Sequence, residues 1–256
     1  LQPLGNVIVV DKEELDLANP DLIRNRVREI KPDIIVNAAA YTAVDKAEEE
    51  PELATAINGV APGILAEEAC RVGAILVHYS TDYIFDGNKK TPYTEEDEPN
   101  PSNVYGKTKL EGECAIRATG VSHLIFRTSW VYGLRGNNFL LTILRLAREQ
   151  PELRIVNDQT GVPNWSRFLA EATAVILSRD YDYLIDRQGT YNLSATGITT
   201  WYGFACRIIE QVSYNTHDIK AKAIHPIATA NFPTLAVRPL YSVLNCSRLQ
   251  NKFNVY

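Results

Sequence analysis

The sequence predicts an α/β fold in which helices cover both faces of a doubly wound parallel sheet. Short apolar runs without polar alternation recur along the first half of the chain, as expected for strands that are buried on both faces. Patterns of helical period lie between these runs, and this alternation favours parallel strands joined by right-handed crossovers. The predicted strands are residues 7–10, 34–36, 75–77 and 124–126.

Three helices are predicted between these strands. Pro20 and Pro51 stand at first helical positions, where the missing N–H of proline costs nothing. Gly73 and Gly120 follow predicted ends, where glycine readily takes the left-handed conformation that stops a helix. The predicted helices are residues 20–30, 51–72 and about 104–118.

The pattern changes after Gly133, which suggests a second, smaller domain. Three further helices and one short strand are predicted there, and the tail from residue 219 is irregular and richer in proline. We therefore predict a Rossmann-type NAD(P)-binding domain over residues 1–133. Residues 134–256 would form a smaller, mainly substrate-binding domain with some segments returning to the main sheet. The predicted helices are residues 137–148, 165–177 and 200–212, and the strand is 154–156.

The composition is that of an ordinary soluble globular protein. Hydrophobic residues make up 45% of the 256 residues and charged residues 22%, and the formal net charge is −5. An acidic balance argues against nucleic acid or an anionic membrane as the main partner. The four cysteines are scattered, with no CxxC pair and no metal-ligand spacing. We predict a cytoplasmic protein without a metal site and with free thiols.

Tyr105 and Lys109 are the strongest candidates for chemistry. They are four residues apart, so they share one face of the predicted helix. A phenol has a pKa near 10 and exchanges protons poorly at neutral pH, whereas a neighbouring ammonium favours the phenolate. Such a pair could give a proton to a carbonyl oxygen as hydride reaches the carbon. The alternative is an ordinary pair on a helix surface, because this spacing often arises by chance.

Thr81 and Asp82 follow the predicted strand 75–77. In open α/β sheets, ligands bind beyond the carboxyl ends of the strands. A hydroxyl at this place could hydrogen-bond a substrate carbonyl and stabilise the charge that develops on it. The alternative is that the hydroxyl only caps a loop or a helix.

The residues at the ends of two further predicted strands suggest a nucleotide-binding site. The small residues 38–40 follow the second predicted strand and would let a flat ligand approach closely; the alternative is tight packing between helix and sheet. Asp11 closes the first predicted strand, where such domains commonly bind the adenosine ribose. The glycine-rich turn that normally precedes this strand is absent, and the sequence starts at Leu1 and contains no methionine. We expect that a first strand and turn precede Leu1 in the gene.

The chain resembles the extended short-chain dehydrogenase/reductase family, and within it the reductases of dTDP-4-dehydro sugars. The resemblance spans nearly the whole sequence and is most specific in its middle motifs. The matching stretches are residues 36–48 (VNAAAYTAVDKAE), 78–87 (HYSTDYIFDG), 103–110 (NVYGKTKL), 126–133 (FRTSWVYG), 157–163 (NDQTGVP) and 238–239 (RP).

This resemblance implies a reaction, a cofactor and a role for each matching residue. The reaction is reduction of the C4 ketone of dTDP-4-dehydro-L-rhamnose with NADPH or NADH, by a monomer or homodimer. Tyr105 would donate the proton, Thr81 would polarise the ketone, and Lys109 would hold the nicotinamide ribose and tune Tyr105. The implied substrate contacts are Asp82, Trp130 and Arg238, and the implied cofactor contacts are Asp11, Asp16, Leu17, Ala40, Tyr41 and Thr42.

Two other functions stay open. Non-catalytic relatives of this fold act as regulatory subunits, for example of methionine adenosyltransferase, and keep the tyrosine–lysine pair. Thr81 and Trp130 favour the reductase over such a subunit. An epimerase or dehydratase of the same family is the other alternative. A dehydratase would place a glutamate after Asp82, where this chain has Tyr83.

Overall fold

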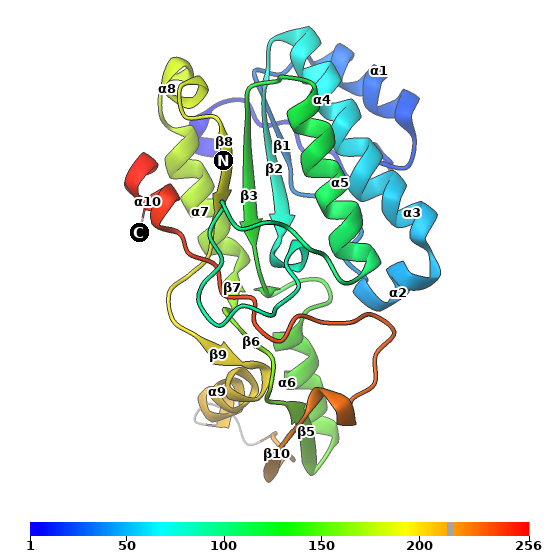
Figure 1. Ribbon diagram of the computed structural model, residues 1–256, viewed down its shortest axis with the longest axis vertical. Helices are drawn as coiled ribbons and strands as arrows, with labels where there is room; N and C mark the ends of the chain where they lie inside the picture. The colour runs from blue at the N-terminus through cyan, green and yellow to red at the C-terminus, as the bar shows by residue number, and fades with distance from the viewer. Residues whose placement is uncertain (214–217, 256) are drawn as a thin grey trace.

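The computed structural model describes residues 1–213 and 218–255. Its centre is a four-stranded sheet in the order β1-β2-β3-β8, and every neighbouring pair in it is parallel (Figure 1). The predicted parallel α/β fold is therefore confirmed. The strands are β1 Ile34–Asn37, β2 Ile75–Thr81, β3 His123–Thr128 and β8 Gly189–Asn192.

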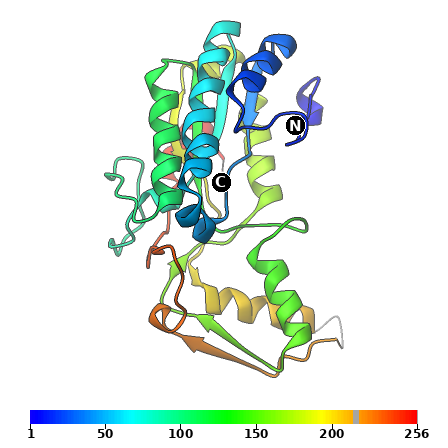
Figure 2. The ribbon, with the colours of Figure 1, turned by 90° about the vertical axis from the view of Figure 1, so that its right-hand side faces the viewer.

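Helices cover both faces of this sheet, as a doubly wound fold requires (Figure 2). One face carries α1, α4 and α5, and the other carries α7, α8 and α10. Their bounds are α1 Pro20–Ile30, α4 Ala61–Val72, α5 Val104–Ala118, α7 Ser166–Leu177, α8 Tyr181–Ile185 and α10 Ser247–Phe253.

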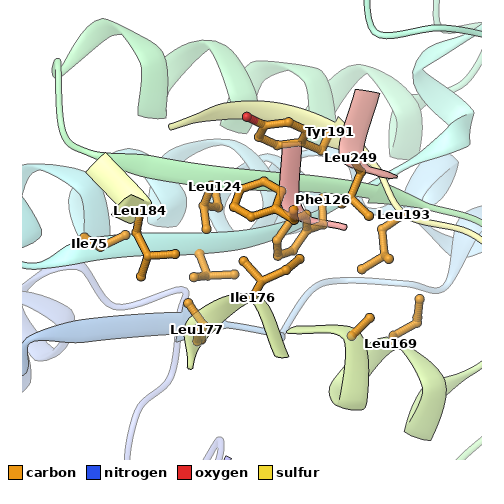
Figure 3. Packing of buried hydrophobic residues seen from close by; sticks show 13 residues of the cluster. Ile75, Leu124, Phe126, Leu169, Ile176, Leu177, Leu184, Tyr191, Leu193 and Leu249 are labelled. Atoms are coloured by element: carbon orange, nitrogen blue, oxygen red, sulfur yellow. The ribbon is translucent and has the colours of Figure 1, made fainter. Parts of the chain in front are cut away.

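The side chains of β2 alternate between these two layers, because successive residues of a strand point to opposite faces. Ile75 and Val77 pack in the core against α7 and α10, as Figure 3 shows for this cluster. Leu76 packs on the other face against α1, α4 and α5. The alternation continues, so that His78 contacts α5 and Tyr79 contacts α7. Register therefore decides which polar side chains of β2 meet α5.

The helix predicted over residues 51–72 is interrupted. It consists of α3 Pro51–Thr55, the π-helical turn η2 Ala56–Val60 and α4, and the helix α2 Val44–Glu49 precedes it without having been predicted. A π turn contains one more residue than an α turn, and such turns occur often at functional sites. The π turn here contains the buried Asn58, whose side-chain amide hydrogen-bonds the backbone of Tyr41.

The prediction of a strand over residues 7–10 is wrong. These residues form no strand, and Ile8 and Val9 are largely exposed. A strand needs a neighbour for its backbone N–H and C=O groups, and no strand of the described residues pairs with this segment. β1 is thus paired on one side only, with β2.

A smaller lobe lies below the carboxyl ends of the sheet strands (Figure 1). Helices α6 Phe139–Glu149 and α9 Trp201–Ser213 pack on a parallel pair of strands, β5 Glu152–Val156 and β10 Ala223–Ile227. These elements confirm the helices predicted over residues 137–148 and 200–212 and the strand predicted over residues 154–156, whereas the helix predicted over residues 165–177 is α7 and packs on the main sheet. Short two-residue pairings link the lobe to the sheet: β4 Val131–Tyr132 with β7 Asn164–Trp165, and β6 Thr160–Gly161 with β9 Thr199–Thr200.

The C-terminal segment returns from the smaller lobe to the main sheet domain (Figure 1). Asn103, the N-cap of α5, donates to the carbonyl of Val237 at 2.8 Å. Leu244 then bridges to Tyr93 beside the sheet domain. The chain thus enters the smaller lobe twice, first with α6 and β5 and then with α9 and β10, and its last return passes over the start of α5. Within the described residues, no helix has the length and apolarity needed to cross a bilayer.

Candidate active site

The carboxyl end of β2 and the first turn of α5 meet tightly. The short helix η3 Asp82–Ile84 follows β2, and the rings of Tyr83 and Tyr105 contact edge to face, with 5.5 Å between centroids. Gly106 allows this approach, because a Cβ at that position would lie 2.1 Å from the carbonyl oxygen of Tyr83. Asn103 starts α5 by accepting a hydrogen bond from the N–H of Gly106 at 2.8 Å. This packing fixes the first turn of α5 against η3.

Thr81 and Tyr105 are brought together at this junction. The Thr81 hydroxyl donates to Asp82 Oδ1 at 3.0 Å and accepts from the N–H of Tyr83 at 3.2 Å. Burial raises the pKa of the Tyr105 phenol, while the nearby Thr81 hydroxyl acts in the opposite direction. The phenol therefore keeps its proton at neutral pH, which suits a proton donor.

Lys109 lies in the same helix but does not tune Tyr105 in the expected way. Its side chain is 1% exposed, and Nζ donates to the carbonyl of Tyr79 at 2.6 Å and lies 3.1 Å from Nε2 of His78. Lys109 is not among the groups that shift the pKa of Tyr105, so the expected lowering of that pKa is not what the structure shows. Burial lowers the pKa of Lys109 itself to about 8, against an opposing effect of Glu113.

Asp82 is a buried carboxylate beside this pair. It is 1% exposed, and its Oδ2 has no hydrogen-bond partner among the described residues. Burial raises the pKa of Asp82 to about 6, although the nearby hydroxyls of Ser242 and Thr81 lower it in part. An incompletely satisfied carboxylate in this position is available to a polar group of a ligand.

Replacing Asp82 with asparagine should stabilise the protein at neutral pH. A carboxyl group whose folded pKa is raised costs stability when it is ionised, and this cost disappears as the pH falls through about 6 toward the unfolded value. We expect Asp82→Asn to increase the free energy of unfolding by roughly 2 kcal/mol at pH 8 and by much less at pH 4. Urea unfolding of both proteins at the two pH values measures this, and an equal effect at both would contradict it.

Arg238 is engaged by the protein itself. Its Nη2 donates to Asp45 Oδ2 at 2.5 Å, and its Nη1 lies 3.5 Å from the hydroxyl of Tyr83. Asp45 also accepts from the N–H of Ala236 at 3.1 Å, so one carboxylate ties α2 to the returning C-terminal segment. The structure therefore places Arg238 next to Tyr83 and η3, with its guanidinium partly neutralised by Asp45.

Trp130 lies at the junction with the smaller lobe. Its backbone has a φ of 42°, which is unusual for a residue with a side chain. Its ring stacks on Trp201 of α9 with centroids 3.6 Å apart, and a Cβ on Gly161 would come within 2.5 Å of the same ring. Trp130 thus links the end of β3 to α9, and both neighbours constrain the plane of its ring.

The residues expected to contact the cofactor fall into two groups. Ala40, Tyr41 and Thr42 follow β1, where Asn58 holds the backbone of Tyr41 and the Tyr41 hydroxyl donates to Glu50 at 2.6 Å. These contacts order the loop after β1.

Asp11, Asp16 and Leu17 form the second group. Asp11 does not close a strand, and its carboxylate accepts from the N–H groups of two residues that follow it. Asp16 caps the N–H of Ala18 at 2.9 Å, while Leu17 packs at the edge of the core formed by α1 and α4. The structure gives these three side chains local roles.

Some polar residues of the site were not singled out from the sequence. His78 and Asn58 are buried at 0% and 1% exposure, and each bonds a candidate residue or its loop. Glu113 and Arg127 form a buried pair beneath Lys109, at 2.7 Å. His78 had a usable signal, because it directly follows the apolar run of β2 and a polar residue there must find a partner. The other three depend on tertiary contacts.

Residues 1–256 match the RmlD substrate binding domain family over the whole chain. The chain belongs to this family. The dTDP-4-dehydrorhamnose reductase of Escherichia coli K12 is 46% identical over 261 residues, which cover 99% of this chain and 86% of that protein. The enzyme of the same name from Burkholderia thailandensis is 44% identical and covers 100% of this chain and 87% of its own length.

Solved structures of the family superimpose on this one. The dTDP-4-dehydrorhamnose reductase of Bacillus anthracis in complex with NADP has a TM-score of 0.86 at 36% identity, covering 94% of this chain and 82% of that one. The structure of the Clostridium acetobutylicum dTDP-4-dehydrorhamnose reductase has a TM-score of 0.87 at 41% identity, and the match covers 95% of this chain and 82% of that one. The predicted family and Rossmann-type fold are therefore confirmed.

Proposed function

We propose that this protein reduces the C4 ketone of dTDP-4-dehydro-L-rhamnose to dTDP-L-rhamnose with hydride from NADPH or NADH. The observation that carries the proposal is that the Thr81 hydroxyl lies near enough to the Tyr105 phenol to lower its pKa, at the carboxyl end of a central parallel strand. Relatives that are 44–46% identical bear the name of this reductase, and a related structure holds NADP. The protein would act in the cytoplasm, as a monomer or homodimer.

Thr81 and Tyr105 would both bind the ketone oxygen. As the carbon gains hydride, the oxygen gains negative charge, and the Thr81 hydroxyl stabilises that charge by a hydrogen bond. Tyr105 then transfers its phenolic proton to this oxygen, which completes the alcohol. The raised pKa of Tyr105 ensures that the proton is present before the reaction.

Residues of this chain fit a nicotinamide nucleotide, which supplies the hydride when bound. Lys109 keeps at least one N–H without a partner among the described residues, because Nζ has only Tyr79 and His78 as neighbours in hydrogen-bond range. A ribose hydroxyl suits such a donor. The small residues 38–40 and the ordered backbone of Tyr41 offer a surface for a flat ring. We propose that residues 1–133 bind the cofactor.

The sugar nucleotide would lie between the two lobes. Trp130 lies at this junction, where it joins β3 to α9 by stacking on Trp201, and Asp82 has a carboxylate oxygen without a hydrogen-bond partner among the described residues. The Arg238 guanidinium can serve the diphosphate, because its planar fork binds phosphate oxygens in pairs and Asp45 fixes its orientation. Arg238 and α9 belong to residues 134–256, the part of the chain that we propose to be mainly substrate-binding, whereas Asp82 and Trp130 would reach the substrate from residues 1–133.

The direct test is an absorbance assay of NADPH and NADH oxidation with dTDP-4-dehydro-L-rhamnose. We expect consumption of the reduced cofactor and formation of dTDP-L-rhamnose, detected by chromatography. Absence of turnover together with co-purification of a larger enzyme would favour a regulatory subunit instead. Product with a retained ketone and an altered configuration would indicate an epimerase.

A further inference from the structure

A chain of hydrogen bonds joins the loop after β1 to the side chain of Lys109. Asn37 Nδ2 lies 3.1 Å from His78 Nδ1, and His78 Nε2 lies 3.1 Å from Lys109 Nζ. All three side chains are at most 6% exposed, so water does not replace these contacts. Because β1, β2 and α5 each contribute one member, the chain exists only in the folded sheet.

The two ends of this chain fix the direction of every bond in it. The N–H of Ala39 can only donate, so the oxygen of Asn37 faces it, at 3.2 Å, and the Asn37 amide NH₂ faces His78. His78 Nδ1 must then accept, which leaves its proton on Nε2. At the other end the carbonyl of Tyr79 can only accept, and Lys109 donates to it. His78 Nε2–H therefore points at Lys109 Nζ.

This direction has a consequence for the charge of Lys109. An uncharged amine has a lone pair that accepts the Nε2–H of His78, whereas an ammonium has no acceptor and meets a second donor there. Moving the His78 proton to Nδ1 does not help, because it would then face the NH₂ group of Asn37. Every hydrogen bond from Asn37 through His78 to Lys109 can therefore form only when Lys109 has given up one proton and is an uncharged amine.

We propose that His78 is a positioning residue whose Nε2–H stabilises the uncharged amine of Lys109 and so makes its ammonium release a proton more readily. This inference rests on the proposed reduction, in which Tyr105 loses a proton in every turnover. The ammonium would return one by relay through a hydroxyl group of the bound ligand: an N–H bond of Lys109 breaks, the O–H bond of Tyr105 forms again, and the amine takes a proton from solvent once the ligand has left.

The charged groups around Lys109 agree with this role. Burial lowers the pKa of Lys109 to about 8, and Glu113, one turn further along α5, raises it in part. Glu113 is itself bound by Arg127 of β3, which limits its effect on Lys109. Burial and the charge of Lys109 hold the pKa of His78 well below its usual value, so His78 stays neutral.

The first measurement is the tautomer of His78, read from the ¹⁵N shifts of its ring nitrogens by NMR. The protein has four histidines, and the spectrum of a His78→Gln variant assigns the signal. We expect the Nε2–H form throughout the range of pH in which the protein is folded. An Nδ1–H form or a charged ring would overturn the proposal. This measurement needs neither cofactor nor turnover, so it stands even if the reductase assay fails.

The second measurement is the dependence of kcat on pH in His78→Gln. Glutamine reaches the place of Nε2 and can offer its oxygen to the ammonium, so the donor that disfavours the charged form becomes an acceptor. We expect the pKa of the basic limb to rise by about one unit. His123→Gln is the matched control, because His123 lies at the start of β3, where its ring contacts the carbonyl of Val121. An unshifted basic limb in an active His78→Gln enzyme would overturn the proposal.

Discussion

Tyr105→Phe is expected to lower kcat by about 10²–10⁴-fold, the usual contribution of a positioned general acid. Phenylalanine keeps the edge-to-face contact with Tyr83 and removes only the proton donor. Thr81 can still hydrogen-bond the ketone, so KM and the free energy of unfolding should change little. Steady-state kinetics with dTDP-4-dehydro-L-rhamnose and NADPH, together with urea unfolding, separate these effects.

Tyr181→Phe is the control for loss of a tyrosine hydroxyl. Its hydroxyl donates to the carbonyl of Gly73 from α8, on the face of the sheet opposite α5. We expect kcat within a factor of about two of the original for this variant. Full activity of Tyr105→Phe would remove Tyr105 from the mechanism and leave Thr81 and Asp82 as the groups to test.

The sheet and its main helices could be predicted from the sequence because their signals are local. The apolar runs 34–36, 75–77 and 124–126 all became strands of one parallel sheet. The boundary signals of α1 were also correct, since Asn19 accepts from the N–H of Leu22 at 3.1 Å and Pro20 is the first helical residue. The spacing of Tyr105 and Lys109 likewise placed both in one helix, as the structure has them.

The remaining features depend on neighbours that a local pattern does not contain. Residues 7–10 have the composition of a strand, but no described strand pairs with them. The helical pattern of residues 51–72 gives no sign of the π turn, which accompanies the contact between Asn58 and Tyr41. The spacing of Tyr105 and Lys109 also does not reveal that Lys109 binds β2, because burial and the register of β2 decide its partners.

The buried ion pair beneath Lys109 is the clearest case of such a tertiary feature. Glu113 is 0% exposed and binds Arg127 through two hydrogen bonds, of 3.0 Å and 2.7 Å. Burial alone would raise the pKa of Glu113, but hydrogen bonds and charge from Arg127 outweigh it and hold that pKa below its usual range. Arg127 has no other carboxylate partner among the described residues. The pair thus joins α5 to β3 beneath the site.

Glu113→Gln should therefore lower the free energy of unfolding by about 3–5 kcal/mol at pH 7, because it leaves the Arg127 guanidinium buried without a counter-charge. A carboxyl group with a lowered folded pKa stabilises above its unfolded pKa and loses this effect as the pH falls. The difference in unfolding free energy between Glu113→Gln and the original protein should thus become smaller when the pH falls below the ordinary pKa range of glutamate. The double variant Glu113→Leu/Arg127→Met should recover most of the loss, since apolar replacement of a buried pair is often neutral. Urea unfolding at several pH values measures all three proteins, and a single variant as stable as the original would mean that the pair contributes no net stability.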